Sequence, residues 1–472
     1  MAAIDIAALR GAIGGDVIAP ADGGYDAARA VWNATIDRRP AAIVRCTGTD
    51  DVVAGLAFAR DSGVRVSVRG GGHNIAGLAV CDGGIVLDLS GLRGAAVDVD
   101  ARVAHVQPGS TWGDVDSATQ AHGLAAPGGI VSTTGVAGFT LGGGIGWLTR
   151  PYGPACDSLV GAEVVTADGA VVEADGDLLW GLRGGGGNFG VVTRFDLRLH
   201  PVGPHVLAGP IAFQLSRLPA VLDMFHTLAA ADHPELTMLL MLRRLSSAEW
   251  VPAAVRGVPS ALLHFCWAGD IAAGRRALAG LQTLGPPLAS ALGRKRYVAW
   301  QSFSDAAWLP GLHNYWKSEY LARVDDVAAL EASTLAVPTA LSDIKVWHLG
   351  GAFARPQEDA AAFAHRSSPF MLNVNARWER PAEAERNVTW ARDVWTALQP
   401  SSAGGVYVNF LGEEGADRVR AAYGDAKYAR LAQLKRRYDP ENVFRVNQNI
   451  VPASGAGRFD RAQLDRGALG RG

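Results

Sequence analysis

Three glycine clusters constrain this chain more than any other feature of its sequence. They stand at 70–72, 142–144 and 184–187, and the first is followed at once by His73. Glycine lets backbone N–H groups approach a ligand closely and adopt positive φ, so a chain can cradle a phosphate without a charged side chain. One such cluster is often a plain turn. Three in one region indicate a ligand site.

The first cluster ends a β-α-β pattern. Residues 41–45 and 64–69 predict strands, and residues 49–62 predict the helix between them. Further strands are expected at 85–89, 103–107, 162–166 and 170–174, and helices at 111–122 and 426–444, the last ended by Asp439-Pro440. A Rossmann fingerprint is excluded because no convincing helix follows the cluster and no acidic residue stands at the expected distance, and no Walker lysine is present.

Composition excludes several classes of partner. The chain has 472 residues, enough for two or three domains, and its 44 basic and 46 acidic residues give a net charge of −2. Neither nucleic acid nor an anionic membrane is expected to bind such a surface, so we expect a small-molecule substrate. The cysteines at 46, 81, 156 and 266 show no CxxC spacing, so neither a metal site nor a disulfide framework is predicted. The oligomeric state stays open.

The location of the protein is predicted from two segments. Asp5 and Arg10 interrupt what would be the apolar core of a signal peptide, so a cytoplasmic protein is expected. The uncharged segment 130–148 is rich in glycine and threonine, which suits close backbone packing better than lipid. No membrane span is predicted.

A series of motifs then points to one family. They are RPAAIVR at 39–45, SVRGGGHN at 67–74, PGG at 127–129, GxxGxxxGGG at 135–144, RGGGGNFGVV at 183–192, YVN at 407–409 and YDPENVFRVNQNI at 438–450. In this order they resemble the FAD-linked oxidases of the vanillyl-alcohol oxidase superfamily, with a PCMH-type FAD domain, and within it the berberine bridge enzyme-like group.

The resemblance implies an α+β fold in two parts. Residues 1–204 (core about 37–204) would form a PCMH-type FAD-binding domain, and 405–455 would return to it. Between them, 205–404 lacks glycine clusters and is rich in alanine, leucine and tryptophan, so it would be an inserted α/β substrate-binding domain with an antiparallel sheet backed by helices. Residues 456–472 would be a tail.

The resemblance also implies how FAD is held. The loop from Arg69 to Asn74 would wrap the pyrophosphate, and His73 would bond covalently to the flavin, since a neutral imidazole is a nucleophile. Val131 stands where other members carry a second tethering cysteine, so a single tether is expected, with Cys156 as a small buried residue. The implied cofactor-binding set is Arg69, Gly70, Gly71, Gly72, His73, Asn74, Gly129, Val131, Thr134, Gly135, Gly138, Thr140, Gly142, Gly143, Gly144, Val192, Asn447 and Asn449.

The resemblance further implies Tyr407 as the catalytic base, with Asn409 on the same face of a strand. A tyrosine base needs its pKa lowered from about 10, for which Lys317 and Arg377 are candidate cations. Tyr407 could instead be a core aromatic residue. Five tryptophans of the second part could line a substrate pocket or belong to the core: Trp300, Trp308, Trp316, Trp347 and Trp378.

These features predict an oxidase that takes hydride from an alcohol, sugar, amine or secondary metabolite and passes electrons to O₂, giving H₂O₂. Gly129 supports oxygen as the acceptor, because the resemblance places an oxygen gate at that position and glycine cannot block it. The same glycines at 127–129 could simply supply positive φ to a turn. A flavin dehydrogenase or oxidative cyclase with another acceptor, and a non-catalytic flavin-binding protein, stay as alternatives.

Overall fold

The sheet nearest the N-terminus carries the β-α-β unit. In the computed structural model, which describes residues 4–454, its strand order is β1-β2-β4-β3. The strands are β1 (Asp16–Ile18), β2 (Ala42–Arg45), β3 (Val66–Arg69) and β4 (Ile85–Asp88). The three last strands are parallel, and helix α3 (Thr49–Asp61) connects β2 to β3. This confirms the predicted unit, which is favoured by the acidic first turn of α3.

A second, antiparallel sheet follows, with strand order β5-β6-β10-β8-β9. Its strands are β5 (Ala95–Asp98), β6 (Val103–Val106), β8 (Leu159–Val165), β9 (Val171–Glu173) and β10 (Val191–Arg198). The hairpin expected around Asp168-Gly169 is present as β8 and β9, and Gly169 takes a φ of 87° in its turn. Shorter elements surround this sheet: α4 (Trp112–Gln120), β7 (Leu124–Ala125), α5 (Val136–Leu141), α6 (Thr149–Tyr152), α7 (Gly176–Leu182) and β11 (His200–Pro201).

The third sheet is the largest and is antiparallel, with strand order β15-β12-β14-β13-β18-β19-β17 and β16 paired to β12. Its strands are β12 (His205–Gln214), β13 (Leu236–Arg244), β14 (Pro259–Trp267), β15 (Ala289–Ser290), β16 (Gly293–Arg296), β17 (His313–Leu321), β18 (Asp343–His348) and β19 (Phe370–Trp378). Alternate side chains of these strands face two different cores, so most positions read as apolar.

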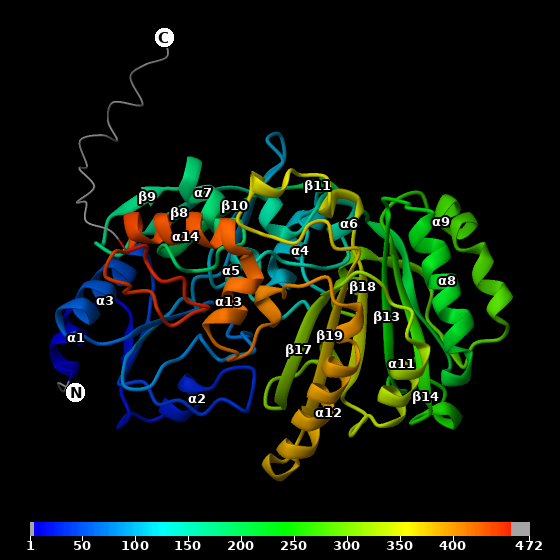
Figure 1. Cartoon of the computed structure of the whole chain (residues 1–472). Coiled ribbons are helices and arrows are strands. Elements are labelled where there is room, and N and C mark those ends of the chain that lie inside the picture. Colours follow the sequence, from blue (N-terminus) through cyan, green and yellow to red (C-terminus); the bar gives the residue numbers. More distant parts are fainter. Residues whose placement is uncertain (1–3, 455–472) are drawn as a thin grey trace.

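Helices cover one face of this third sheet (Figure 1). They are α8 (Leu218–Ala230), α9 (Ile271–Ala277), α11 (Val327–Leu335) and α12 (Ala384–Ala397). The other face packs against Trp147 and neighbouring residues of the preceding segment, and α10 (Tyr297–Gln301) contacts α4 there. The sheet-and-helix architecture confirms the expected α+β fold with an antiparallel sheet backed by helices.

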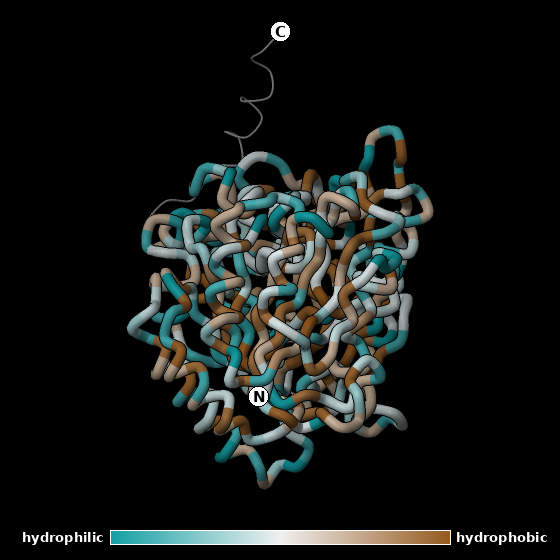
Figure 2. Tube along the Cα trace, turned by 90° about the vertical axis from the view of Figure 1, so that its right-hand side faces the viewer, coloured by the Kyte–Doolittle hydropathy of each residue, from teal (hydrophilic) through white to brown (hydrophobic). Residues whose placement is uncertain are grey.

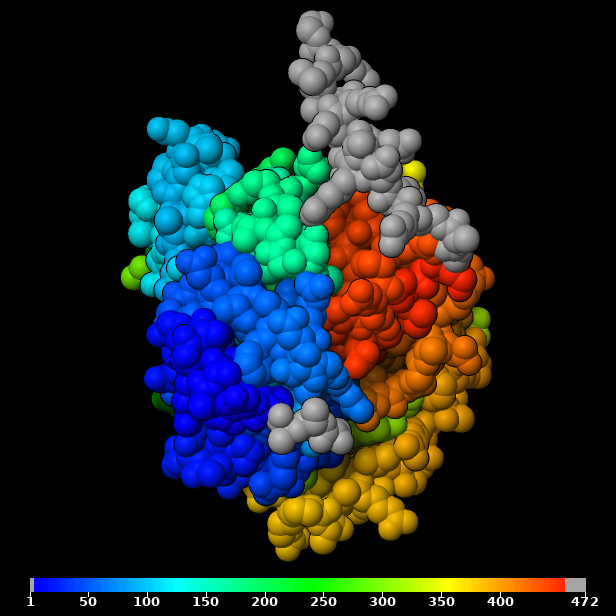
Figure 3. All heavy atoms as spheres, turned by 90° about the vertical axis from the view of Figure 1, so that its left-hand side faces the viewer, coloured from blue at the N-terminus to red at the C-terminus, as the bar shows by residue number. Residues whose placement is uncertain are grey.

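The end of the described chain returns to the first part through α13 (Ala416–Tyr423) and α14 (Asp425–Tyr438). In α14 the fully buried Lys435 pairs with Asp439 at 2.7 Å and donates to the carbonyl of Asn188 at 2.8 Å. Figure 3 shows this orange-red segment directly beside the blue N-terminal one. The boundaries at 204 and 404 stay predictions, and the expected tail 456–472 lies outside the described residues.

Apolar residues gather inside the fold and polar ones at its edges (Figure 2). Segment 130–148 forms buried loops and the short helix α5 rather than one long helix. Within residues 4–454, no helix combines the length and the apolar character that crossing a bilayer requires.

Candidate functional site

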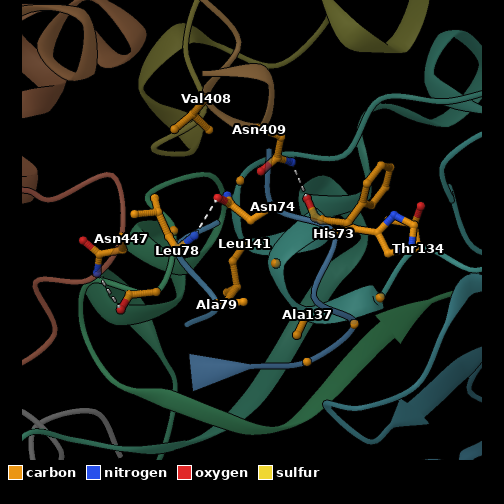
Figure 4. Close-up of a pocket in the computed structure, with 18 of the residues that line it drawn as sticks. His73, Asn74, Leu78, Ala79, Thr134, Ala137, Leu141, Val408, Asn409 and Asn447 are labelled. Atoms are coloured by element: carbon orange, nitrogen blue, oxygen red, sulfur yellow. Dashed lines mark hydrogen bonds between the residues drawn. The ribbon is translucent and has the colours of Figure 1, made fainter. Parts of the chain in front are cut away.

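A cavity of about 310 Å³ lies where all of these parts meet. Figure 4 shows lining side chains from the first glycine loop, from α5 and from the C-terminal segment around it. Of the residues predicted to bind FAD or substrate, the following line the cavity: Gly70, Gly71, Gly72, His73, Asn74, Gly129, Val131, Thr134, Gly135, Gly138, Gly142, Val192, Asn409 and Asn447. The sequence motifs therefore converge on one place.

Close backbone packing, besides a ligand, explains why glycine stands in the first cluster. A Cβ added at Gly71 would lie 2.6 Å from the Cα of Gly135, and one at Gly70 would lie 2.9 Å from the carbonyl oxygen of Pro108. Gly72 turns the chain with a φ of 69°. The loop at 70–72 therefore touches the loop that begins at Gly135, and this close packing also favours glycine at positions 70 and 71.

Gly138 and Gly187 behave differently. Both line the cavity, and a Cβ at either position would meet no atom within 4 Å. Side chains there would stand in space that is large enough for a ligand to fill. These two glycines, rather than those at 70 and 71, are where the chain leaves room.

Some predicted residues do not line the cavity: Arg69, Thr140, Gly143, Gly144, Tyr407 and Asn449. The guanidinium of Arg69 donates instead to Asp88 at 3.0 Å and to the carbonyl of Ala28 at 2.6 Å. Gly143 and Gly144 have φ values of 117° and 90°, so they shape the turn after α5. The structure therefore does not place these six residues in the cavity wall, where the sequence motifs predicted them.

Asn447 offers the cavity an unused acceptor. Its Nδ2 donates to the carbonyl of Phe444 at 2.8 Å, while its Oδ1 is buried without a hydrogen-bond partner. Buried polar atoms in folded proteins nearly always have partners, so an unpaired one beside a cavity indicates a ligand.

His73 lies on the cavity wall with its ring stacked on Trp32, at 5.3 Å between centroids and 16° between planes. Burial lowers the pKa of His73 to about 4. Its imidazole is therefore neutral near pH 7, and a neutral ring nitrogen can act as a nucleophile. No sequence signal pointed to Trp32, which reaches the site from a segment that precedes the glycine loop.

Tyr407 is oriented differently from the prediction. It precedes a 3-10 turn (Val408–Phe410) rather than lying in a strand, although its hydroxyl still meets Asn409. That hydroxyl accepts hydrogen bonds from the backbone of Gly144 at 2.8 Å and Ile145 at 3.2 Å, and from Asn409 Nδ2 at 2.9 Å. Burial raises the pKa of Tyr407 well above its usual value, although these hydrogen bonds oppose the rise.

Neither proposed cation lowers that pKa. Lys317 forms an ion pair with Glu414, and Arg377 lies over the ring of Trp308, 4.1 Å from its centroid. The pKa of Tyr407 is raised rather than lowered, because desolvation dominates over the donors around the hydroxyl, and its role as base stays a prediction.

An aromatic wall forms the side of the cavity that the third sheet provides. Trp308, Trp316 and Trp347 line it with Phe410, whereas Trp300 and Trp378 are core residues, each 1% exposed. Lys345 and Asn373 also line it, and the sequence analysis missed both. The signal for Lys345 lay in the alternation of DIKVWH at 343–348, which places Asp343, Lys345 and Trp347 on one face of β18. The signal for Asn373 lay in the polar alternation of FMLNVNARW at 370–378 in β19.

Comparisons with known proteins show the family of the chain. Residues 40–175 match the family described as "FAD binding domain", and residues 406–451 match "Berberine and berberine like". The (R)-6-hydroxynicotine oxidase of Paenarthrobacter nicotinovorans is 32% identical over 461 residues, covering 93% of this chain and 97% of that protein. The chain belongs to the berberine bridge enzyme-like FAD-linked oxidoreductases.

Further similar proteins also match this chain over nearly its whole length. An uncharacterized FAD-linked oxidoreductase of Bacillus subtilis is 30% identical over 458 residues, covering 93% of this chain and 97% of that protein. The crystal structure of 6-hydroxy-D-nicotine oxidase from Arthrobacter nicotinovorans superposes with a TM-score of 0.85 at 29% identity, covering 93% and 98% of the two chains. Xylooligosaccharide oxidase from Myceliophthora thermophila, at 23% identity and a TM-score of 0.81, shares the fold.

The site fits the cofactor of this family. Gly138 and Gly187 leave open space, Asn447 offers an unpaired acceptor and His73 is neutral on the wall. FAD supplies a ring that accepts two electrons and a hydrogen from substrate. The protein is an FAD-dependent oxidoreductase.

Proposed function

We propose that this protein is a covalent FAD oxidase, which takes hydride from an alcohol, sugar, amine or secondary metabolite and passes electrons to O₂ to give H₂O₂. The observation that carries the proposal is His73. Its imidazole lies on the cavity wall, and burial lowers its pKa to about 4. The nucleophilic neutral ring is therefore available at the pH of a cell, and the stack on Trp32 fixes its orientation.

A single tether is supported by the residues around the cavity. Val131 lines the cavity and packs with Trp32 and Ile75 in one apolar cluster, and valine cannot bond to a flavin. Cys156 is fully buried and is not part of the lining, and burial raises the pKa of its thiol. A thiol kept protonated is a poor nucleophile.

Access for oxygen is supported by Gly129. It lines the cavity and has no side chain, and its φ is not positive, so the alternative that it serves only to supply positive φ is wrong. A Cβ there would lie 3.1 Å from Cε2 of Phe139. Larger side chains at this position would therefore displace the Phe139 ring as well as narrow the cavity.

Acid precipitation tests the tether. The precipitated protein should stay yellow, and His73→Ala should release its flavin into the supernatant while retaining some non-covalent binding. His200→Ala is the matched control, because burial also lowers the pKa of His200 to about 4 and its ring stacks on Tyr152, away from the cavity lining. Flavin that stays attached in His73→Ala would refute the assignment, and mapping would then show the true anchor.

Oxygen use is a separate measurement. A panel of alcohols, sugars and amines that bleaches the flavin without air identifies substrates, and peroxide formed on readmitting air identifies an oxidase. Bleaching without peroxide would indicate a dehydrogenase or cyclase with another acceptor. No bleaching by any compound would favour a protein that binds flavin without turnover.

A further inference from the structure

The aromatic wall of the cavity carries a buried charged group, Lys345, which has no part in the flavin attachment or the oxygen access described above. Lys345 lines the cavity from the middle of the third sheet and is 2% exposed. Its Nζ donates to Asp343 at 2.8 Å and lies 4.2 Å from the centroid of Trp308. Buried lysines are rare, and one that lines a cavity is a candidate for binding or proton transfer.

The charges around Lys345 do not balance. Arg243 from β13 lies 3.8 Å from Asp343, and Arg377 from β19 stacks on the same Trp308 ring as Lys345. His264 from β14 is neutral, because burial lowers its pKa to about 3 and both Lys345 and Arg243 contribute in the same direction. Three cationic side chains thus share the carboxylate of Asp343, so this wall favours negative charge in a ligand.

The lining on this side of the cavity also holds unpaired hydrogen-bond donors. Three residues that line the cavity carry a buried N–H group with no partner: Asn373 at Nδ2, and Trp316 and Trp347 at Nε1. Asn373 is directly opposite Lys345 in the pairing of β18 with β19. Unpaired buried donors require an acceptor from the ligand. A hydroxyl or carbonyl oxygen supplies one, whereas a protonated amine has none.

We propose that this wall binds an oxygen substituent of a planar aromatic substrate, and that Lys345 takes the proton from its hydroxyl group during oxidation. The proposal rests on the flavin chemistry proposed above. The substrate carbon gives its hydrogen and two electrons to the flavin, the O–H proton goes to Nζ of Lys345, and the C–O bond becomes C=O. Asp343 positions the lysine, and Trp308 and Trp316 contact the ring.

The protonation of Lys345 suits this role. Burial lowers its pKa to about 8, although the attraction of Asp343 raises it. The neutral amine that accepts a proton is therefore a minority near pH 7 and becomes the main form above about 8. We expect the rate of flavin reduction by an aromatic alcohol to rise with pH and to level off above that value.

Binding of para-nitrophenol to the flavin-loaded protein tests the wall directly, since its ionised form is coloured. The parent should bind it preferentially as phenolate, and benzylamine, a cation of similar size, should bind far more weakly. Lys345→Met should weaken phenolate binding roughly tenfold or more, as expected when about one pKa unit of interaction is lost. Equal binding of the two probes to the parent would overturn the proposal without any variant.

Two variants sharpen the test. Lys345→Arg keeps the charge but cannot give up its proton, so phenolate binding should persist while reduction by benzyl alcohol or a larger aryl alcohol is lost. Lys317→Met is the matched control, because Lys317 is also buried, ion-paired to Glu414 and 4.7 Å from the ring of Trp395, but is not part of the lining. It should change neither binding nor reduction.

Failure of this inference is distinguishable from failure of the proposed function. Flavin bleached by amines but not by alcohols, in a protein that stays yellow in acid, would reject Lys345 and keep the covalent oxidase. Phenolate binding that is unchanged in Lys345→Met would reject it equally.

Discussion

Tyr407 places Asn409 at the cavity. Its hydroxyl accepts hydrogen bonds from the backbone of Gly144 and Ile145 and from Asn409 itself. Asn409 Nδ2 also donates to the carbonyl of Phe139 at 2.9 Å, which fixes the amide at the cavity wall. A side chain that is 1% exposed and bonded in this way holds two loops together.

Replacing Tyr407 by phenylalanine separates this positioning role from the base role predicted by resemblance. The variant leaves two buried backbone N–H groups unpaired, so its free energy of unfolding should fall by about 1–3 kcal/mol. Flavin reduction should slow by less than about tenfold if another group takes the proton, whereas loss of a base costs roughly a hundred- to ten-thousand-fold. Denaturant unfolding and anaerobic stopped-flow measure the two effects.

Tyr25→Phe serves as the control for that experiment. Its hydroxyl donates to one carbonyl, that of Pro40 at 2.7 Å, and it is not part of the cavity lining. We expect a smaller loss of stability and unchanged flavin reduction. A slowing of a hundredfold or more in Tyr407→Phe, at normal flavin content, would restore Tyr407 as the base.

At the scale of elements, α5 presents its glycine to the cavity. Gly138 lies inside this helix, where alanine would be favoured by about 1 kcal/mol, yet it leaves the lining bare. We expect Gly138→Leu to fold and to lose most of its bound flavin, because the new side chain would occupy ligand space. The ratio of flavin to protein absorbance measures this.

Gly11→Leu is the matched control for α5. Gly11 also lies in a helix, α1 (Ile6–Ala12), and a Cβ there would meet no atom within 4 Å, but it is not part of the lining. Flavin content should be unchanged in this variant. Equal flavin content in both variants would mean that the space beside Gly138 is not used by the cofactor.

Elements with strong local signals were predictable from the sequence, and those set by distant contacts were not. The β-α-β unit and the hairpin at Asp168-Gly169 follow from periodicity and turn residues. The turn after Tyr407 reads as a strand, because its conformation depends on hydrogen bonds to the loop at 144–145. The contact between Gly71 and Gly135 and the cluster around Lys345 depend on tertiary packing, which periodicity does not report.

At the scale of the whole molecule, Asp116 lies buried where α4 meets α10, between the first part of the chain and the third sheet. Its Oδ2 accepts from Gln301 at 3.1 Å and its Oδ1 has no partner. Burial raises the pKa of Asp116 to about 7 from an ordinary 3.8, and nearby Asp305 adds to the rise. The carboxyl is thus protonated in the folded protein under mildly acidic conditions.

This predicts a pH dependence of known sign. Between the two pKa values the unfolded chain has lost the proton and the folded chain keeps it, so the contribution of Asp116 to stability is full below about 4 and lost as pH rises to about 7. Asp116→Asn should remove this slope, which amounts to at most about 4 kcal/mol. Unfolding of parent and variant across this pH range measures the difference.

Asp114, on the same helix, should make stability depend on pH in the opposite direction. Burial would raise its pKa, but hydrogen bonds from Thr111 and Arg93 outweigh burial and lower it. Asp114→Asn should therefore cost stability above the ordinary pKa and little below it.

A parent and an Asp116→Asn variant with identical pH profiles would show that Asp116 is ionised in the folded protein.

The cavity is lined by residues from both ends of the chain, so the ribosome makes one side of it well before the other. The loop at 70–74 emerges early, but the lining that includes Phe444 and Asn447 comes near the end of 472 residues. At about 5–20 residues per second, roughly 20–75 s separate the two on the ribosome. A growing chain offers the flavin only part of its pocket during that time. The amount of bound flavin in a cell extract should then report only chains that were translated beyond these lining residues. Chains whose translation is arrested before residue 444 should be colourless.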